Sequence, residues 1–236
     1  MTFDGVMQEL EALANPEKVL FKAKKFGINT SNSLGIYHKD LKEIAKEIGH
    51  DDQLALALFD SGIYEARILS SKIFSPKSVT EELADKWVQV FDTWEICDSF
   101  CMGLIAKSDC ALSKAYEWVN RESEFEKRAG FVLMASYGFA DKKASNDLFE
   151  NFLPIIKQEA TDSRIYVKKA VNWALRNIGK RNIDLHAKAL GTAKEILEID
   201  HPAAQWIAKD AIKELEKSGL SILGYPRTSY ERIKMP

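Results

Sequence analysis

Hydrophobic residues recur at intervals of three and four along most of the chain, the spacing that places them on one face of an α-helix. The segment 41–48 follows this pattern, and Gly49 comes directly after it as a stop signal. Runs such as LALALF and FVLMASYGF are apolar on more than one side, so their helices need neighbours on two sides. No stretch alternates β-branched and polar residues as a half-buried strand would. The pattern therefore predicts an all-α protein of about a dozen helices.

The predicted helices are organised as pairs that recur about every 35–40 residues, a spacing typical of α-solenoids such as HEAT repeats. The period alone leaves a globular helical bundle open as the alternative. No linker rich in Pro, Gly or Ser divides the chain. We therefore expect one HEAT-like superhelical domain over 1–219. The segment 220–236 has little helical period and is expected to form an irregular C-terminal arm.

The composition of the chain excludes several classes of protein. Of 236 residues, 46% are hydrophobic, which excludes a disordered chain. A net charge of −2 excludes a uniformly basic nucleic-acid-binding protein but not a local basic patch. No apolar run approaches the roughly 18 residues of a membrane span. Three cysteines and the absence of targeting signals predict a reducing compartment, the cytoplasm.

The segment 164–181 reverses the charge of the chain locally, because it contains basic residues and no acidic ones. Its six basic residues are Arg164, Lys168, Lys169, Arg176, Lys180 and Arg181. On a helix, one face is apolar and consists of Val167, Val171, Ala174 and Ile178. The opposite face places Trp173 among Lys169, Arg176 and Lys180. Cations with an interleaved aromatic ring are typical of a nucleic-acid surface. The alternative is a solvated face whose tryptophan a neighbouring helix covers.

A second segment, 91–105, places Trp94 and Asp98 four residues apart, so the two side chains are neighbours on one helical face. The adjacent positions form a packed face of Ile96, Cys97, Phe100 and Leu104. A carboxylate at the edge of an apolar region needs a partner or a chemical task. The alternative is a structural aspartate that is hydrogen-bonded to a neighbouring helix.

The segment 123–139 contains a cation within an apolar stripe, Arg128. A buried cation requires an anion, which could be a carboxylate such as Asp98 or a phosphate group. The sequence leaves both open. Ser123 and Glu126 have the spacing of a capping box at the start of this helix.

The sequence predicts no metal and no cofactor. Cys97 and Cys101 are four residues apart, but Cys110 lies further on and the four histidines are scattered. A zinc site would need a fourth ligand, so we interpret these cysteines as packing residues. No glycine-rich phosphate loop indicates a nucleotide cofactor.

Together these residues make the sequence resemble the DNA alkylation repair family of AlkD-like glycosylases. The resemblance is carried by Trp94-x-x-x-Asp98, by Arg128 in KRAGF and by Trp173 in VNWALRNIGK. Two further stretches are similar, GIYHKDLKEIAKEI at 35–48 and YEARILSSKIF at 64–74. The similarity extends from about Phe21 to about Lys180, most of the chain.

The resemblance implies a right-handed superhelix of HEAT-like repeats with a concave, basic groove for double-stranded DNA. It implies that the protein excises N3- and N7-alkylated purines without base flipping and without a metal or organic cofactor. Asp98 would be the catalytic carboxylate, Trp94 and Trp173 would flank the deoxyribose of the lesion, and Arg128 would hold a backbone phosphate. We expect a monomer whose DNA contacts come from the basic helix. The expected DNA-binding residues are Lys168, Lys169, Arg176, Lys180 and Arg181.

A second class of function stays open on the sequence alone. The chain could be a non-catalytic HEAT-like module that binds branched or bent DNA, or a protein partner. The Trp94 and Asp98 pair and the basic face around Trp173 favour the enzyme, whereas the net negative charge favours the module.

Overall fold

The protein is all-helical, as the hydrophobic pattern predicts. The computed structural model describes residues 1–26 and 30–226. Within these ranges there are thirteen α-helices and three short 3-10 helices, and no β-strand. None of the described helices is both long and apolar enough to cross a membrane. The chain divides into two compact units, Met1–Ala111 and Leu112–Pro236, which we describe separately.

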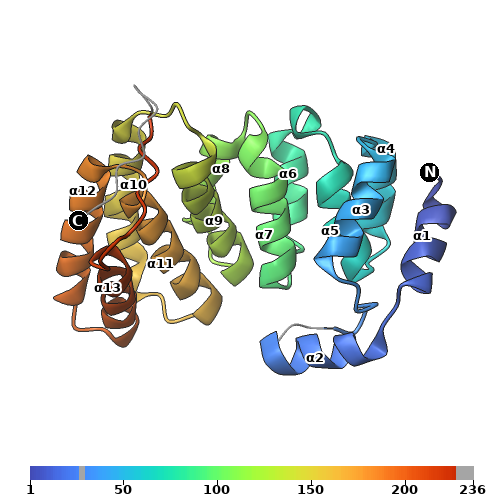
Figure 1. The fold of residues 1–236 in the computed structure, drawn as a ribbon, viewed down its shortest axis with the longest axis horizontal. Helices are drawn as coiled ribbons and strands as arrows, with labels where there is room; N and C mark the ends of the chain where they lie inside the picture. Colours follow the sequence, from blue (N-terminus) through green and yellow to red (C-terminus); the bar gives the residue numbers. More distant parts are fainter. Residues whose placement is uncertain (27–29, 227–236) are drawn as a thin grey trace. The chain divides into compact units, whose positions relative to one another are not determined.

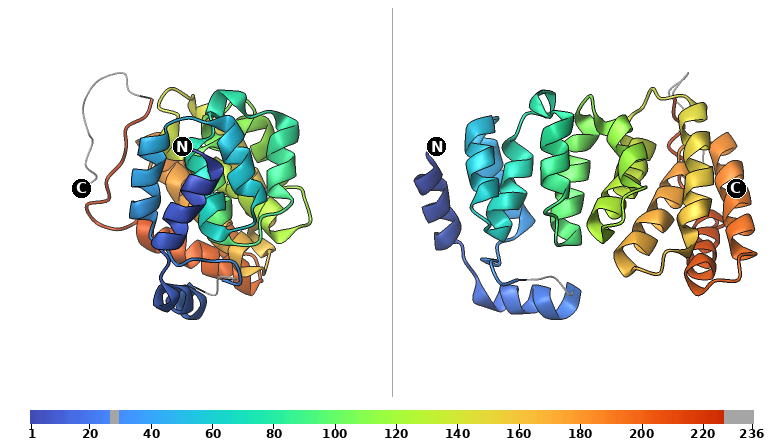
Figure 2. Two further views of the ribbon diagram at one scale, coloured as in Figure 1. Left: turned by 90° about the vertical axis from the view of Figure 1, so that its right-hand side faces the viewer. Right: turned by 180° about the vertical axis from the view of Figure 1, so that it is seen from behind.

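The α-helices of the N-terminal unit are short, with at most 11 residues each. They are α1 (Phe3–Ala12), α2 (Pro16–Phe26), α3 (His38–Ile48), α4 (Asp52–Asp60), α5 (Tyr64–Ile73), α6 (Glu81–Val88) and α7 (Trp94–Gly103). Helix α5 is central, because α3, α4 and α7 all pack against it. Helix α2 runs crosswise to the other helices of its unit in the front and back views (Figure 1, Figure 2).

The C-terminal unit contains one short helix, α8 (Ala111–Trp118), and five longer ones. The longer ones are α9 (Glu124–Ala140), α10 (Asn146–Gln158), α11 (Ile165–Gly179), α12 (Ile183–Leu197) and α13 (Pro202–Leu215). Helix α11 packs against α9, α12 and α13, so it is the central element of this unit (Figure 1).

The core of the N-terminal unit is aromatic. The ring centroids of Trp87 and Phe100 lie 5.1 Å apart, and Phe59 and Phe74 pack edge-on against this pair. Edge-on and tilted arrangements are the preferred geometries of aromatic pairs. Phe100 belongs to α7, so this cluster fixes the buried face of the helix that carries Trp94 and Asp98.

Close helix packing in the C-terminal unit depends on glycines within helices. A Cβ atom on Gly138 of α9 would lie 3.2 Å from the Asn177 backbone of α11. A Cβ on Gly130 would lie 2.7 Å from the backbone nitrogen of Val119, which follows α8. Real Cβ atoms rarely approach so closely, so glycine lets α9 approach both neighbours.

Residues 220–226 contain no helix, and they pack on the residues that follow α11. The Leu223 N–H donates to the Lys180 carbonyl, and the Tyr225 N–H donates to the Arg181 carbonyl. Ile222 and Tyr225 are buried. The remainder of the expected arm, 227–236, lies outside the described residues.

The predicted helix start at Ser123 is confirmed, but the predicted capping box is not formed. Ser123 is the N-cap of α9, but its side chain makes no capping hydrogen bond. Glu126 instead accepts a hydrogen bond of 2.8 Å from Arg121. The predicted capping box is therefore absent, and its glutamate pairs with a cation that precedes the helix.

Candidate nucleic-acid interface

Helix α7 presents one acid and one indole on its partly exposed face. Trp94 and Asp98 are both partly exposed and lie one helical turn apart. The predicted packed face is confirmed, because Ile96, Cys97 and Phe100 are at most 2% exposed. The N-cap Thr93 accepts a 3.3 Å hydrogen bond from the Ile96 N–H and fixes where the helix starts. Packing of one face thus determines where the carboxylate and the indole point.

The other side of α7 is anchored by a carboxylate that the sequence analysis did not single out, Glu95. Its side chain is hydrogen-bonded to His38 at 2.5 Å and to the Tyr64 hydroxyl, and Lys22 Nζ lies 3.6 Å away. Burial alone would raise the pKa of Glu95, but the hydrogen bonds from His38 and Tyr64 and the charge of Lys22 hold it at about 2. Burial and the neighbouring Glu95 raise the pKa of Tyr64.

A second buried carboxylate, Glu65 of α5, fixes the segment that leads into α3. Glu65 is fully buried and accepts hydrogen bonds from the Ser33 hydroxyl and from the Leu34 and Gly35 N–H groups, at 2.7 to 2.9 Å. Gly35 has a φ of 77° and a Cβ there would lie 2.2 Å from the Asn15 carbonyl oxygen. A residue with a side chain does not fit this position. The only sequence signal for both glutamates is local, since each stands directly between two apolar residues.

In the C-terminal unit, α11 has the two faces that its sequence predicts. Val167, Val171, Ala174 and Ile178 are fully buried. Trp173 is partly exposed, so its indole is not sealed inside the unit. Lys169 is exposed, and Lys168 Nζ lies 4.8 Å from the ring centroid of Trp206 on α13. The surface of α11 and α13 at this end therefore presents two cations and two indoles, Trp173 from α11 and Trp206 from α13.

At the other end of the same face, acidic side chains of α13 compensate the positive charges of α11. Arg176 Nη1 forms an ion pair with Glu214 of α13, and Lys180 Nζ lies 2.6 Å from the same carboxylate. Arg176 Nε lies 3.7 Å from Asp210. Burial would raise the pKa of Glu214, but the hydrogen bonds from Lys180 and Arg176 lower it. The acidic partners belong to another helix, so a helical projection of 164–181 does not include them.

Arg181 has a packing role rather than the expected DNA contact. Its residue surface is 0% exposed, and its guanidinium lies 4.1 Å from the ring centroid of Phe149. It donates hydrogen bonds to the carbonyls of Gly138 and Ala144, at 3.3 and 2.8 Å. Burial lowers the pKa of Arg181. A side chain enclosed in this way cannot reach a phosphate group, so we correct the expectation for this residue.

Arg128 is also buried, at 6% exposure, as its position in an apolar stripe predicts. Its Nη1 donates a 2.7 Å hydrogen bond to the Tyr166 carbonyl in the first turn of α11. The buried guanidinium of Arg128 is thus stabilised in part by a backbone carbonyl oxygen, whereas the sequence suggested a carboxylate or a phosphate group. Arg128 connects α9 to the start of the basic helix, and the expectation that it holds a phosphate stays a prediction.

The expected site residues are divided between the two units. Trp94 and Asp98 belong to the N-terminal unit, and Arg128 and Trp173 to the C-terminal one. The convergence of the two indoles on one carboxylate stays a prediction.

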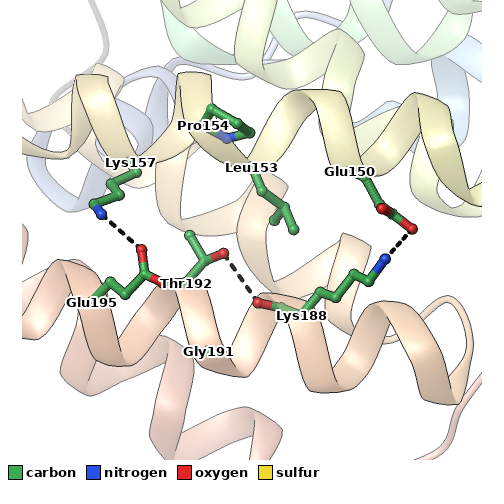
Figure 3. Close-up of a pocket in the computed structure, with 8 residues that line it drawn as sticks. All are labelled: Glu150, Leu153, Pro154, Lys157, Lys188, Gly191, Thr192 and Glu195. Carbon is green, nitrogen blue, oxygen red and sulfur yellow. Dashed lines mark hydrogen bonds and ion pairs between the residues drawn. The ribbon is translucent and has the colours of Figure 1, made fainter.

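A groove of about 520 Å³ lies between α10 and α12, and the residues that line it are not among the predicted site residues (Figure 3). Leu153 and Pro154 line it. Its charged residues pair with one another: Lys157 with Glu195, and Lys188 with Glu150 (Figure 3). A groove whose charges are already compensated has little attraction for an anion such as DNA.

The cysteines are buried thiols. Cys97, Cys101 and Cys110 carry no disulfide. Within residues 1–26 and 30–226, no group of three or more His, Cys, Asp or Glu side chains is arranged to hold a metal ion.

Comparison with known proteins places the chain in a family. The sequence profile of a family described as "DNA alkylation repair enzyme" matches residues 6–215. Two uncharacterized Listeria proteins are similar over 223 residues, covering 92% of this chain and 97% of each relative. The protein of Listeria innocua is 25% identical and that of Listeria monocytogenes 24%.

A solved structure has the same fold, with a TM-score of 0.76, 25% identity and coverage of 98% of this chain and 99% of that chain. It is described as belonging to "a new family of proteins related to the HEAT-like repeat DNA glycosylases with affinity for branched DNA structures". The expected HEAT-like architecture is thereby confirmed. Since the profile covers most of the chain, this protein belongs to the DNA alkylation repair enzyme family.

Proposed function

We propose that this protein is a monofunctional DNA glycosylase that hydrolyses the N-glycosidic bond of cationic N3- and N7-alkylated purines in duplex DNA, without base flipping. Asp98 is the catalytic carboxylate in this proposal, and Trp94 and Trp173 flank the deoxyribose. The observation that carries the proposal is the pair on α7: a partly exposed carboxylate one turn from a partly exposed indole, on a helix whose other face is packed.

Few groups are needed for this chemistry. A 3-methyladenine or 7-methylguanine base is already cationic, so it leaves with the electron pair of the C1′–N bond as a neutral molecule. Positive charge then develops on the sugar, where a fixed carboxylate stabilises it and orients the attacking water. Water adds to C1′ and loses a proton. Aromatic faces beside the sugar contribute on the order of 1–2 kcal/mol through cation–π attraction.

The reaction as proposed uses water as nucleophile and no lysine, so the DNA strand is not cleaved. Neutral base adducts leave poorly without a general acid. The proposal therefore includes selectivity for lesions that carry a positive charge on the base.

Phosphate contacts in this proposal come first from Lys168 and Lys169. Arg176 and Lys180 contribute less, because Glu214 already compensates their charge. Arg128 acts as a positioning residue for the first turn of α11 through its bond to Tyr166.

The test is release of free 3-methyladenine and 7-methylguanine from fully paired methylated duplex DNA. Wild-type protein should release both, and Asp98→Asn should abolish release while DNA binding persists. Asp92→Asn is the matched control, because Asp92 is an exposed acid just before α7 and should leave release unchanged. Release by Asp98→Asn at the wild-type rate would refute the catalytic assignment.

A salt titration tests the surface. Lys169→Ala should flatten the slope of log affinity against log salt by about 0.9 if the lysine contacts one phosphate. Lys188→Ala is the control, since its ammonium pairs with Glu150 in the α10–α12 groove. If the two variants gave equal slopes of log affinity against log salt, the proposed contact between Lys169 and a DNA phosphate would be refuted.

The second candidate function is a module that binds branched DNA without chemistry. It is favoured by the description of the solved relative and by the neutralised end of the α11 face. Two measurements separate the candidates. A module binds a three-way junction more tightly than a linear duplex, and it releases no methylated base.

A further inference from the structure

The N-terminal unit contains a cavity that the proposed glycosylase chemistry does not use. It has a volume of about 500 Å³ and lies where α2 meets the start of α3. Pockets that bind small molecules have volumes of about 300–1,000 Å³. We call it the α2–α3 pocket and define it by Lys18, Phe21, Lys22, Tyr37, His38 and Lys39.

Two large aromatic side chains of the α2–α3 pocket are in contact with solvent. Phe21 is 51% exposed and Tyr37 is 53% exposed. Rings on different elements at one cavity offer flat, apolar faces to a planar ligand. Lys18 Nζ lies 3.5 Å from the ring centroid of Tyr37 and covers one face of that ring. The lining is thus aromatic and cationic together, which is the combination that recognises unpaired nucleotides.

A buried ammonium at the α2–α3 pocket lacks a hydrogen-bond acceptor. Lys22 is only 9% exposed, and among the described residues its Nζ atom makes no hydrogen bond. The carboxylates of Glu95 and Glu65 lie 3.6 and 3.8 Å from it, beyond hydrogen-bond distance. An ammonium has three N–H donors, and leaving buried donors unpaired is costly. An acceptor supplied by a ligand would satisfy them.

The carboxylates that line the pocket do not reverse its charge. Glu95 is held by His38, Tyr64 and Lys22. Asp40 also lines the cavity, against the three lysines. The pocket therefore suits an anion with a flat ring.

We propose that the α2–α3 pocket binds one unstacked nucleotide of a single-stranded DNA segment. The base stacks against Phe21 and Tyr37, its phosphate lies near Lys18 and Lys39, and Lys22 donates to an oxygen or ring nitrogen of the nucleotide. A fully paired duplex offers no such base, so this site reads strand openings, as in a branched substrate. The inference rests on the proposed DNA-binding function and adds a contact for single-stranded DNA to it.

The test uses a thymidine pentanucleotide with 2-aminopurine at its centre, a base whose fluorescence is quenched by stacking. Wild-type protein should quench it saturably. Phe21→Ala and Tyr37→Ala should each weaken binding about ten-fold, the loss expected for one base–aromatic stack. Both side chains are half-exposed, so these variants should fold. Phe139→Ala is the matched control, because Phe139 is 37% exposed on α9 and lies outside the pocket; its affinity should equal that of the wild type.

Two outcomes overturn the inference: no quenching by the wild-type protein, or equal affinity of the pocket variants and Phe139→Ala. The same variants are assayed for base release from fully paired methylated duplex, where we expect wild-type rates. Wild-type protein that quenches the probe but releases no base would refute the glycosylase alone. Wild-type protein that releases base but does not quench the probe would refute the pocket alone.

Discussion

Replacing Glu95 by glutamine should lower the free energy of unfolding of the N-terminal unit, and the loss should depend on pH. Glu95→Gln keeps the size of the side chain but removes the charge that His38, Tyr64 and Lys22 surround. A buried ammonium then loses one of its two carboxylates. Removing one partner of a buried ionic cluster is strongly destabilising.

The magnitude follows from the pKa of Glu95, which is lowered from 4.5 to about 2. At about 1.36 kcal/mol per pKa unit, the ionised carboxylate contributes about 3 kcal/mol to the free energy of unfolding at pH 7. A lowered pKa means that the unfolded chain binds the proton more readily. The contribution is therefore complete above about pH 5, falls to about 1.4 kcal/mol at pH 3 and is lost near pH 2.

The assay is urea unfolding at pH 7 and pH 3, followed by hydrogen exchange in peptides of α5 and α7 so that the N-terminal unit is observed by itself. Glu95→Gln should raise exchange in α7 roughly a hundred-fold at pH 7 relative to wild type. Glu43→Gln is the control, because Glu43 is exposed on α3 and its loss should cost less than about 0.5 kcal/mol. A stability gap between wild type and Glu95→Gln that is as large at pH 3 as at pH 7 would refute this reasoning.

Four further substitutions test the C-terminal unit. Gly130→Ala should lower the free energy of unfolding by about 1–3 kcal/mol, because its Cβ would lie 2.7 Å from Val119. Gly191→Ala should raise the free energy of unfolding by up to about 1 kcal/mol, because nothing lies within 4 Å of the new Cβ. Melting temperatures of the two glycine variants that shift in the same direction would contradict this pair of predictions. Glu214→Gln should free the charges of Arg176 and Lys180 on α11. The slope of log affinity against log salt, measured by fluorescence anisotropy, should then become steeper by up to about two. An unchanged slope would show that the two cations do not contact DNA. Arg181→Met should cost about 3 kcal/mol in urea unfolding, because buried carbonyls lose their donor, and should leave the salt slope unchanged; a flatter slope would return Arg181 to the DNA surface.

Hydrophobic spacing determined the helices and their buried faces, because a helix places every third or fourth residue on one side whatever surrounds it. The packed faces of α7 and α11 follow in full from this periodicity. The pair Trp94 and Asp98 is also a local feature, since two residues four apart on a helix must be neighbours.

The partners of charged residues were decided only by the tertiary structure. Glu214 neutralises Arg176 and Lys180 from a helix 34 to 38 residues further along the chain, and Arg181 is enclosed by carbonyls and rings from α9 and α10 and the segment between them. Likewise, Lys22, His38 and Glu95 meet although 57 residues separate the last two. Periodicity shows which face a side chain occupies, but the charge opposite that face depends on which helices pack together, and this is a property of the whole fold.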